Sequence, residues 1–218
     1  MRRFPPLVFF LAAGAALWAG LRGRQSAAAP LTGPRRLAAL GASITQWPKR
    51  TPGRHEGGYA GEAAAHLPPG STAVSFGYMG QGTHYLANKV GEALAERPTD
   101  LVVLGGVNDA ASGRSAAHAI EGLKRVYAAA KAAGVRVVGV TITPWGAYRR
   151  TNARQQAVSA AVNRWVLNEA PVDAAVDTSV LGDADGRLLS RYDSGDHLHL
   201  NAAGQRALGR QIYEAAFR

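Results

Sequence analysis

The sequence predicts an α/β fold, a three-layer α/β/α sandwich around a central, mostly parallel sheet of five strands. Apolar runs of strand length alternate along the chain with longer segments in which apolar residues recur at helical spacing. The run at residues 100–106 is apolar after its first residue, as expected for a strand covered on both faces. Strands that alternate with helices favour a parallel sheet with helices on both sides.

The expected strands are short and end at glycines, prolines or polar residues. They lie at residues 37–41, 72–76, 100–106, 135–142 and 172–176. The fourth is rich in β-branched side chains, which fit a pleated and buried surface. The segment 47–58 between the first strand and the first helix is rich in Pro, Gly and basic residues, and we expect it to be a loop.

The expected helices cover residues 59–67, 83–96, 115–133, 154–169 and a final segment after Asn201. A side chain of the Asn type is favoured at a helix N-cap, so Asn201 marks the start of the last helix. Along that helix Leu208, Ile212 and Ala216 form a stripe that should face the core.

Composition limits the function classes. The chain has 218 residues, of which 47% are hydrophobic and 18% charged, as expected for one globular domain and a leader. It has no cysteine, which excludes disulfides and thiolate chemistry. The formal charge of +10 falls to +6 without the four arginines at positions 2, 3, 22 and 24. The remaining basic residues are scattered, which indicates a solvated surface and no nucleic-acid partner.

Residues 1–30 are predicted to be a signal peptide or an N-terminal membrane anchor, and residues 31–218 the folded domain. Two arginines precede an uncharged run at residues 4–21, and small residues follow at 27–29. This order is typical of an export signal cleaved near 27–29, so we expect a periplasmic or secreted protein. The alternative is association with a membrane through an uncleaved residue 4–21 segment, which has about the minimum length for spanning a bilayer.

A serine follows the first expected strand. Gly41 lets the backbone turn, and Ser43 then stands at the carboxyl end of the strand, where open α/β sheets bind ligands. A serine hydroxyl is a weak nucleophile unless a base takes its proton. The non-catalytic alternative is that Ser43 only caps a helix.

The rest of the chain can supply the base and the donors. Asp196 and His199 are three residues apart in a loop, so the carboxylate can orient one imidazole nitrogen while the other faces Ser43, as in a catalytic triad. Asn108, which follows the third strand, can aim its amide at a developing oxyanion, unless it is only a turn residue. The glycine-rich segment 77–82 can offer a backbone N–H to the same point.

Two further sets of residues allow other interpretations. His197 and His199 with Asp193 and Asp196 could together bind a metal, although this leaves Ser43 unexplained. Trp145 follows the fourth strand, on the same rim as the serine. It is a candidate substrate-binding residue, and packing beneath a loop is the alternative.

With these motifs the sequence resembles the SGNH, or GDSL-type, hydrolase family of esterases and lipases, from about Leu37 to the C-terminus. The resemblance implies a flavodoxin-like sheet and the catalytic residues Ser43, Asp196 and His199. It also implies an oxyanion hole formed by Ser43, Gly80 and Asn108. The family usually has an aspartate just before the serine, where this chain has Ala42. The implied roles do not require that carboxylate.

We therefore expect a serine esterase that hydrolyses carboxylic esters, with short acyl or O-acetyl groups, through an acyl-enzyme. The substrate is a small-molecule or polymer-borne ester, and no metal or organic cofactor is expected. A lysophospholipase or thioesterase would use the same residues. A non-catalytic carbohydrate-binding accessory protein on the same fold is the alternative from another class.

Overall fold

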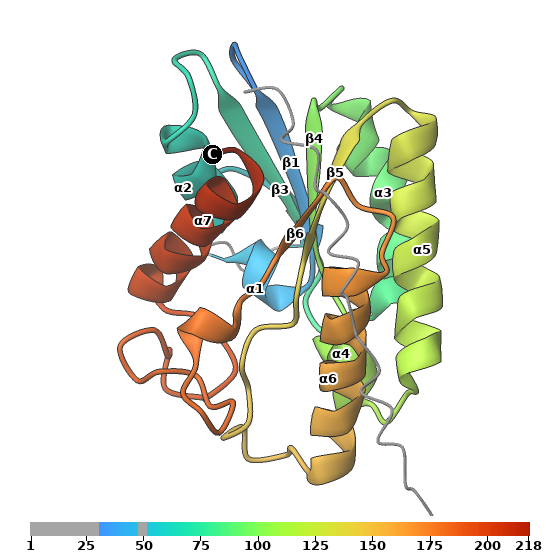
Figure 1. Ribbon diagram of the computed structural model, residues 1–218, viewed down its shortest axis with the longest axis vertical. Coiled ribbons are helices and arrows are strands. Elements are labelled where there is room, and N and C mark those ends of the chain that lie inside the picture. The colour runs from blue at the N-terminus through green and yellow to red at the C-terminus, as the bar shows by residue number, and fades with distance from the viewer. Residues whose placement is uncertain (1–30, 48–51) are drawn as a thin grey trace, which may run out of the picture.

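The computed structural model describes residues 31–47 and 52–218, so the predicted leader at residues 1–30 lies outside the described residues. Within these residues six strands form one sheet between two layers of helices, which confirms the three-layer α/β/α prediction (Figure 1). The strands are β1 (Arg36–Gly41), β2 (Gly53–His55), β3 (Thr72–Gly77), β4 (Asp100–Leu104), β5 (Arg136–Val140) and β6 (Ala174–Val176). None of the described helices is both long enough and apolar enough to cross a membrane.

The strand order brings the candidate functional segments to one edge of the sheet. The order is β2-β3-β1-β4-β5-β6, and every pair is parallel except β2 with β3. Counted along the chain, the five parallel strands have the flavodoxin-like order 2-1-3-4-5. Gly41 at the end of β1 pairs with Gly77 of β3 and with Leu104 of β4. The carboxyl ends of these strands therefore lie side by side.

The prediction of five strands was wrong by one, because part of the expected loop 47–58 forms β2 at the sheet edge. Gly53 pairs with Gly77, and His55 pairs with Ser75, in antiparallel register. The buried imidazole of His55 donates from Nε2 to the Thr45 carbonyl at 2.8 Å. A three-residue edge strand that contains glycine and arginine has no apolar alternation by which the sequence could reveal it.

The five expected helices are present with ends shifted by one or two residues. They are α2 (Gly58–Ala65), α3 (Thr83–Ala95), α5 (Ala116–Ala132), α6 (Ala153–Asn168) and α7 (Ala202–Ala216). The Asn201 side chain accepts from Gly204 N at 2.9 Å, which confirms the predicted cap. Three single-turn elements were not predicted, namely α1 (Ser43–Gln46), α4 (Val107–Ala111) and the 3₁₀ turn η1 (Ser179–Leu181). One turn is too short to show helical periodicity.

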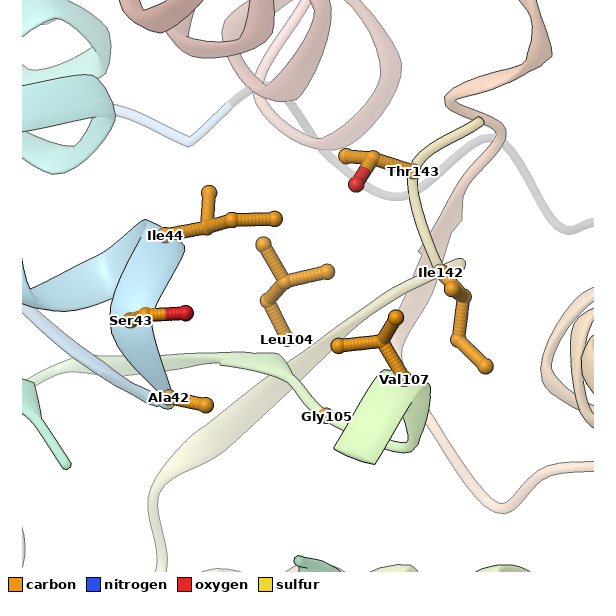
Figure 2. Close-up of a pocket in the computed structure, with 8 residues that line it drawn as sticks. All are labelled: Ala42, Ser43, Ile44, Leu104, Gly105, Val107, Ile142 and Thr143. Atoms are coloured by element: carbon orange, nitrogen blue, oxygen red, sulfur yellow. The ribbon is translucent and has the colours of Figure 1, made fainter. Parts of the chain in front are cut away.

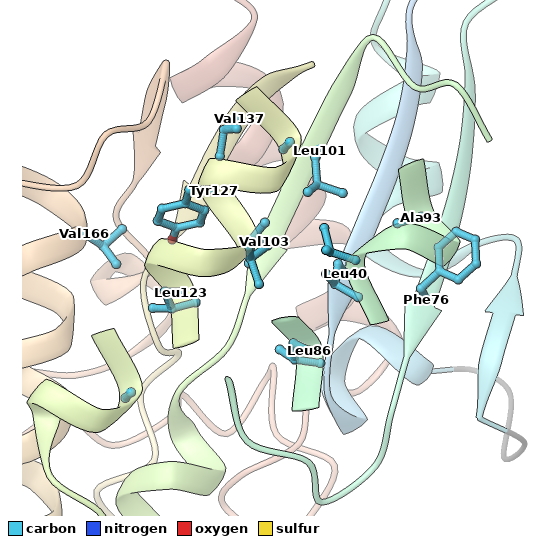
Figure 3. Close-up of a cluster of buried hydrophobic side chains, with 14 of the residues drawn as sticks. Leu40, Phe76, Leu86, Ala93, Leu101, Val103, Leu123, Tyr127, Val137 and Val166 are labelled. Atoms are coloured by element: carbon cyan, nitrogen blue, oxygen red, sulfur yellow. The ribbon is translucent and has the colours of Figure 1, made fainter. Parts of the chain in front are cut away.

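Two apolar clusters hold the layers together, one on each face of the sheet. Helices α3, α5 and α6 cover one face, and α2 and α7 cover the other (Figure 1). Figure 3 shows Leu101 and Val103 of β4 in the first cluster, beside Leu123 and Tyr127 of α5. The alternate residues of β4, including Val102, belong to the second cluster. Both faces of β4 are buried, which explains its uninterrupted apolar sequence.

Candidate active site

Ser43 is the first residue of α1, directly after β1. A side chain at Gly41 would collide with the Thr45 side chain and the Leu104 carbonyl, so only glycine fits where the chain turns. The single turn of α1 is closed by a hydrogen bond from Gln46 N to the Ala42 carbonyl at 3.0 Å. Ala42 itself is 6% exposed. The Ser43 side chain is thereby held at the carboxyl edge of the sheet.

His199 and Asp196 lie in the loop before α7 and reach Ser43. His199 Nε2 is 2.8 Å from Ser43 Oγ, and His199 Nδ1 is 2.5 Å from Asp196 Oδ2. Because an ionised carboxylate only accepts hydrogen bonds, Nδ1 carries the imidazole proton. Nε2 is then the acceptor for the serine hydroxyl. The three predicted residues are brought together in the order that proton removal from Ser43 requires.

The second oxygen of Asp196 fixes the loop backbone. Oδ1 accepts from His199 N at 2.8 Å, from Leu198 N at 3.0 Å and from Ser194 Oγ at 3.2 Å. Burial raises the pKa of Asp196, but the backbone N–H of His199, its imidazole and Leu198 N–H outweigh burial and lower the pKa to about 2. The carboxylate is therefore charged at neutral pH and holds the proton on His199 Nδ1.

The candidate oxyanion donors come from two loops that are bonded to each other. Asn108 in α4 donates from Nδ2 to the Gln81 carbonyl at 2.9 Å, which leaves one amide hydrogen for a ligand. Gly80 precedes Gln81 and has φ of 74°, a left-handed conformation that favours glycine. The neighbouring Met79 N donates to Gln46 Oε1 of α1 at 2.9 Å. These bonds tie the loop that carries Gly80 to both Asn108 and the serine turn.

Asp109 reinforces the same arrangement. Its side chain is 3% exposed and accepts from Thr83 N at 3.0 Å and from Thr83 Oγ1 at 3.2 Å. It therefore fixes the start of α3 relative to α4. Its sequence position after Asn108 gave no sign of a partner 26 residues away.

A small cavity opens beside the serine hydroxyl (Figure 2). The empty space there, counted together with the open solvent at its mouth, is about 260 Å³, and the enclosed part is much smaller. Its lining residues are Ala42, Ser43, Ile44, Leu104, Gly105, Val107, Ile142 and Thr143. Apart from Ser43 and Thr143 their side chains are apolar or absent. These residues show no common pattern in the sequence, because they are spread over the ends of three strands.

The structure places Trp145 in the core and not on the rim where the sequence analysis put its candidate substrate-binding role. Trp145 is 1% exposed, and its Nε1–H donates to Ser159 Oγ of α6 at 3.1 Å. It does not line the cavity beside Ser43, whereas Ile142 and Thr143 from the same segment do. The packing alternative for this aromatic is therefore the one that the structure favours.

The residues of the metal alternative form two carboxylate–histidine pairs. His197 Nδ1 lies 2.6 Å from Asp193 Oδ2, while His199 is bonded to Asp196. Asp193 Oδ1 also accepts from Gly195 N at 2.8 Å and from His197 N at 2.9 Å. In the described part of the chain, no three His, Cys, Asp or Glu side chains are grouped so that they could hold a metal ion.

The comparison with protein families gives a match over most of the chain. The model of the GDSL-like lipase/acylhydrolase family matches residues 39–207, which is more than half of the chain. No curated protein matches the sequence.

Solved structures match over most of the chain at low identity. A putative lipolytic protein of the G-D-S-L family from Desulfitobacterium hafniense has a TM-score of 0.68 and 17% identity, with 83% of this chain and 98% of that chain covered. A catalytic mutant of an acetylxylan esterase from Geobacillus stearothermophilus has a TM-score of 0.64 and 17% identity, with coverages of 86% and 97%. At such identities these two structures show the shared fold.

Proposed function

The chain belongs to the GDSL-like lipase/acylhydrolase family, and from this premise we propose that it is a serine esterase that works through an acyl-enzyme. Family membership supports ester hydrolysis in general. The observation that carries the finer proposal is the continuous hydrogen-bonded series from Asp196 Oδ2 through His199 to Ser43 Oγ, with distances of 2.5 and 2.8 Å.

In the proposed reaction Ser43 Oγ attacks the ester carbonyl while His199 Nε2 takes the hydroxyl proton. The imidazolium formed is stabilised by the charged Asp196, whose low pKa keeps it ionised. His199 then protonates the leaving alcohol, and the acyl group remains on Ser43. Water repeats the sequence with His199 as base and releases the acid. No metal or organic cofactor takes part in these steps.

The carbonyl oxygen becomes negatively charged when Ser43 attacks. We assign its stabilisation to the backbone N–H of Ser43, the backbone N–H of Gly80 and the free amide hydrogen of Asn108. Such donors act because they are already oriented before charge develops. The hydrogen bond from Asn108 to the Gln81 carbonyl supports this assignment, since it fixes the amide plane beside the Gly80 loop.

The proposed substrates are esters of short acyl groups, including O-acetyl groups. The cavity beside Ser43 is small and lined mainly by apolar side chains, which favours a short acyl group over a long one. One structural neighbour is an acetylxylan esterase, which agrees with a small acyl group. Thioester and lysophospholipid hydrolysis would use the same residues, and a non-catalytic carbohydrate-binding role is the alternative without chemistry.

Labelling of the serine tests the proposal. A p-nitrophenyl phosphonate should add to Ser43 and abolish hydrolysis of p-nitrophenyl acetate, and the Ser43→Ala protein should remain unlabelled and inactive. Rates with acetyl, butyryl and dodecanoyl esters should fall with chain length. If the Ser43→Ala variant kept activity, or if chelators abolished it in the wild type, the serine mechanism would be refuted.

We also propose that the protein is exported, because residues 1–30 have the order of charged, apolar and small residues that is typical of an export signal. Mass spectrometry of protein produced in a bacterial host should give a mature start near residues 28–31. An intact Met1 in the membrane fraction would instead support the uncleaved anchor.

A further inference from the structure

The hydroxyl of Thr143 has no partner within the described part of the protein, although the residue is only 1% exposed. Figure 2 shows its oxygen pointing into the cavity beside Ser43, toward Ile44 and Leu104. A buried hydroxyl that makes no hydrogen bond is unfavourable. A ligand with a polar group inside the cavity would supply the missing hydrogen bond.

The surrounding structure holds this hydroxyl in place. The side chain of Asn163 on α6 pairs with both backbone groups of Ile142, accepting from its N–H at 2.7 Å and donating to its carbonyl at 3.1 Å. On the other side of Thr143, the buried Trp145 is fixed by its bond to Ser159. Threonine has a branched and stiff side chain. The direction of the hydroxyl is therefore set by the fold.

A second threonine two residues earlier, in the same segment, has hydrogen-bond partners for its hydroxyl. Thr141 is also 1% exposed, but its Oγ1 is 2.8 Å from Thr178 Oγ1 and accepts from Thr178 N at 2.9 Å. The same segment thus satisfies one buried hydroxyl fully and leaves the other directed into the cavity. Thr141 provides a matched control.

The two sides of the ester have different surroundings. The side chains of His199 and Asp196 are 36% and 44% exposed, so the edge of the site where the alcohol is protonated opens to solvent. The cavity between the ends of β1, β4 and β5 is small and mainly apolar. A polymer-borne or bulky alcohol fits only the open edge, which leaves the cavity for the acyl group.

We propose that the cavity takes a short acyl group that carries a hydroxyl, and that Thr143 Oγ1 is the hydrogen-bond partner of this hydroxyl. Thr143 is then a specificity-determining residue, and the favoured substrates are esters of short hydroxy acids. This inference rests on the proposed esterase function. A plain acyl chain leaves the Thr143 hydroxyl unpaired in the complex, whereas a hydroxyacyl chain pairs it.

The test compares ethyl 3-hydroxybutyrate, as separate enantiomers, with ethyl butyrate. Acid release is followed in a pH-stat for the wild type and for Thr143→Val, Thr143→Ser and Thr141→Val. For the wild type we expect kcat/KM for one enantiomer of ethyl 3-hydroxybutyrate to exceed kcat/KM for ethyl butyrate by about tenfold. A ratio of this size corresponds to one paired buried hydroxyl. Thr143→Val should reduce this ratio to about one, and Thr143→Ser should keep it. Thr141→Val should keep the ratio while lowering Tm, since it removes bonds to Thr178.

The outcomes separate this inference from the esterase proposal. If ethyl butyrate is hydrolysed by the wild type and not by Ser43→Ala, the esterase proposal is supported. If the wild type then has the same kcat/KM for ethyl 3-hydroxybutyrate and ethyl butyrate, only the hydroxyacyl inference is overturned. A ratio that survives in Thr143→Val, or falls equally in Thr141→Val, also overturns it. 2-Hydroxyethyl butyrate carries a hydroxyl on the alcohol side of the ester. If the wild type prefers it to ethyl butyrate and Thr143→Val loses this preference, the acyl assignment is overturned. If no ester is hydrolysed and Ser43 takes no phosphonate, both proposals fail.

Discussion

Replacing Asp196 by asparagine should reduce activity more than replacing it by alanine. The oxygen of an asparagine can keep the Oδ1 bonds from His199 N and Leu198 N, since backbone N–H groups need an acceptor there. Its amide nitrogen then faces His199 Nδ1 in place of Oδ2, and it donates. His199 must accept at Nδ1 and carry its proton on Nε2, which is the wrong tautomer for taking the proton of Ser43.

The magnitude follows from this tautomer. We expect Asp196→Asn to lower kcat by about 10⁴-fold, the size of loss seen when a triad histidine is held in the wrong tautomer. Asp196→Ala should lose less, because the His199 and Asp196 side chains are 36% and 44% exposed and water can accept from Nδ1–H. The assay is hydrolysis of p-nitrophenyl acetate at pH 7.5, with ¹⁵N NMR of His199 to read the tautomer. A greater loss in Asp196→Ala, or an Nδ1–H tautomer in Asp196→Asn, would refute the reasoning.

The pH dependence of stability provides a control for this pair of variants. Asp196 has a folded pKa of about 2, below its ordinary value of 3.8, so its charged form stabilises the fold above about pH 4. That contribution is lost as the pH falls through about 2. The free energy of unfolding should therefore fall less between pH 4 and pH 2 in Asp196→Asn than in the wild type. An equal fall would show that the carboxylate is not held by these bonds.

Three further predictions concern the remaining site residues. Ser43→Ala and His199→Ala should each remove most of kcat, and the double variant should be scarcely worse, because the two act as a unit; additive losses would contradict this. Asn108→Ala should lower kcat by about 10²–10³-fold with little change in KM, as expected for one oxyanion donor, and an effect confined to KM would assign it to substrate binding instead. His197→Ala should leave kcat nearly unchanged. Asp193→Ala should lower kcat, because Asp193 also accepts hydrogen bonds from Gly195 N and His197 N. An inactive His197→Ala together with an active His199→Ala would show that the base is misassigned.

The parts of the site that the sequence revealed are those governed by local spacing. Asp196 and His199 are three residues apart, so any compact loop allows the carboxylate to reach the imidazole. Asn108 and Ser43 each follow an apolar strand, and parallel strands bring their carboxyl ends to one edge. These signals need no knowledge of which helix packs where.

The features that the sequence did not reveal depend on tertiary environment. Trp145 was placed on the rim because it follows a strand, but a hydrogen bond to Ser159 and contacts with α6 draw it inward. Thr143 gave no signal at all, because the absence of a partner for its hydroxyl emerges only once the surrounding side chains are placed. The edge strand β2 was missed because its pairing with β3 supplies the order that its sequence lacks.

Ser43 and its base His199 are 156 residues apart in the sequence, and a glutamine that looks like a surface residue in the sequence links the serine turn to the helix after His199. Gln205 in α7 is 2% exposed and donates from Nε2 to the Ile44 carbonyl at 2.9 Å, one residue beyond the nucleophile. Its Oε1 accepts from Tyr59 N at the start of α2 at 3.0 Å. Both ends of this buried amide are satisfied, so α7 is fixed to the serine turn. Because His199 lies in the loop that leads into α7, this amide also links the end of that loop to the serine turn.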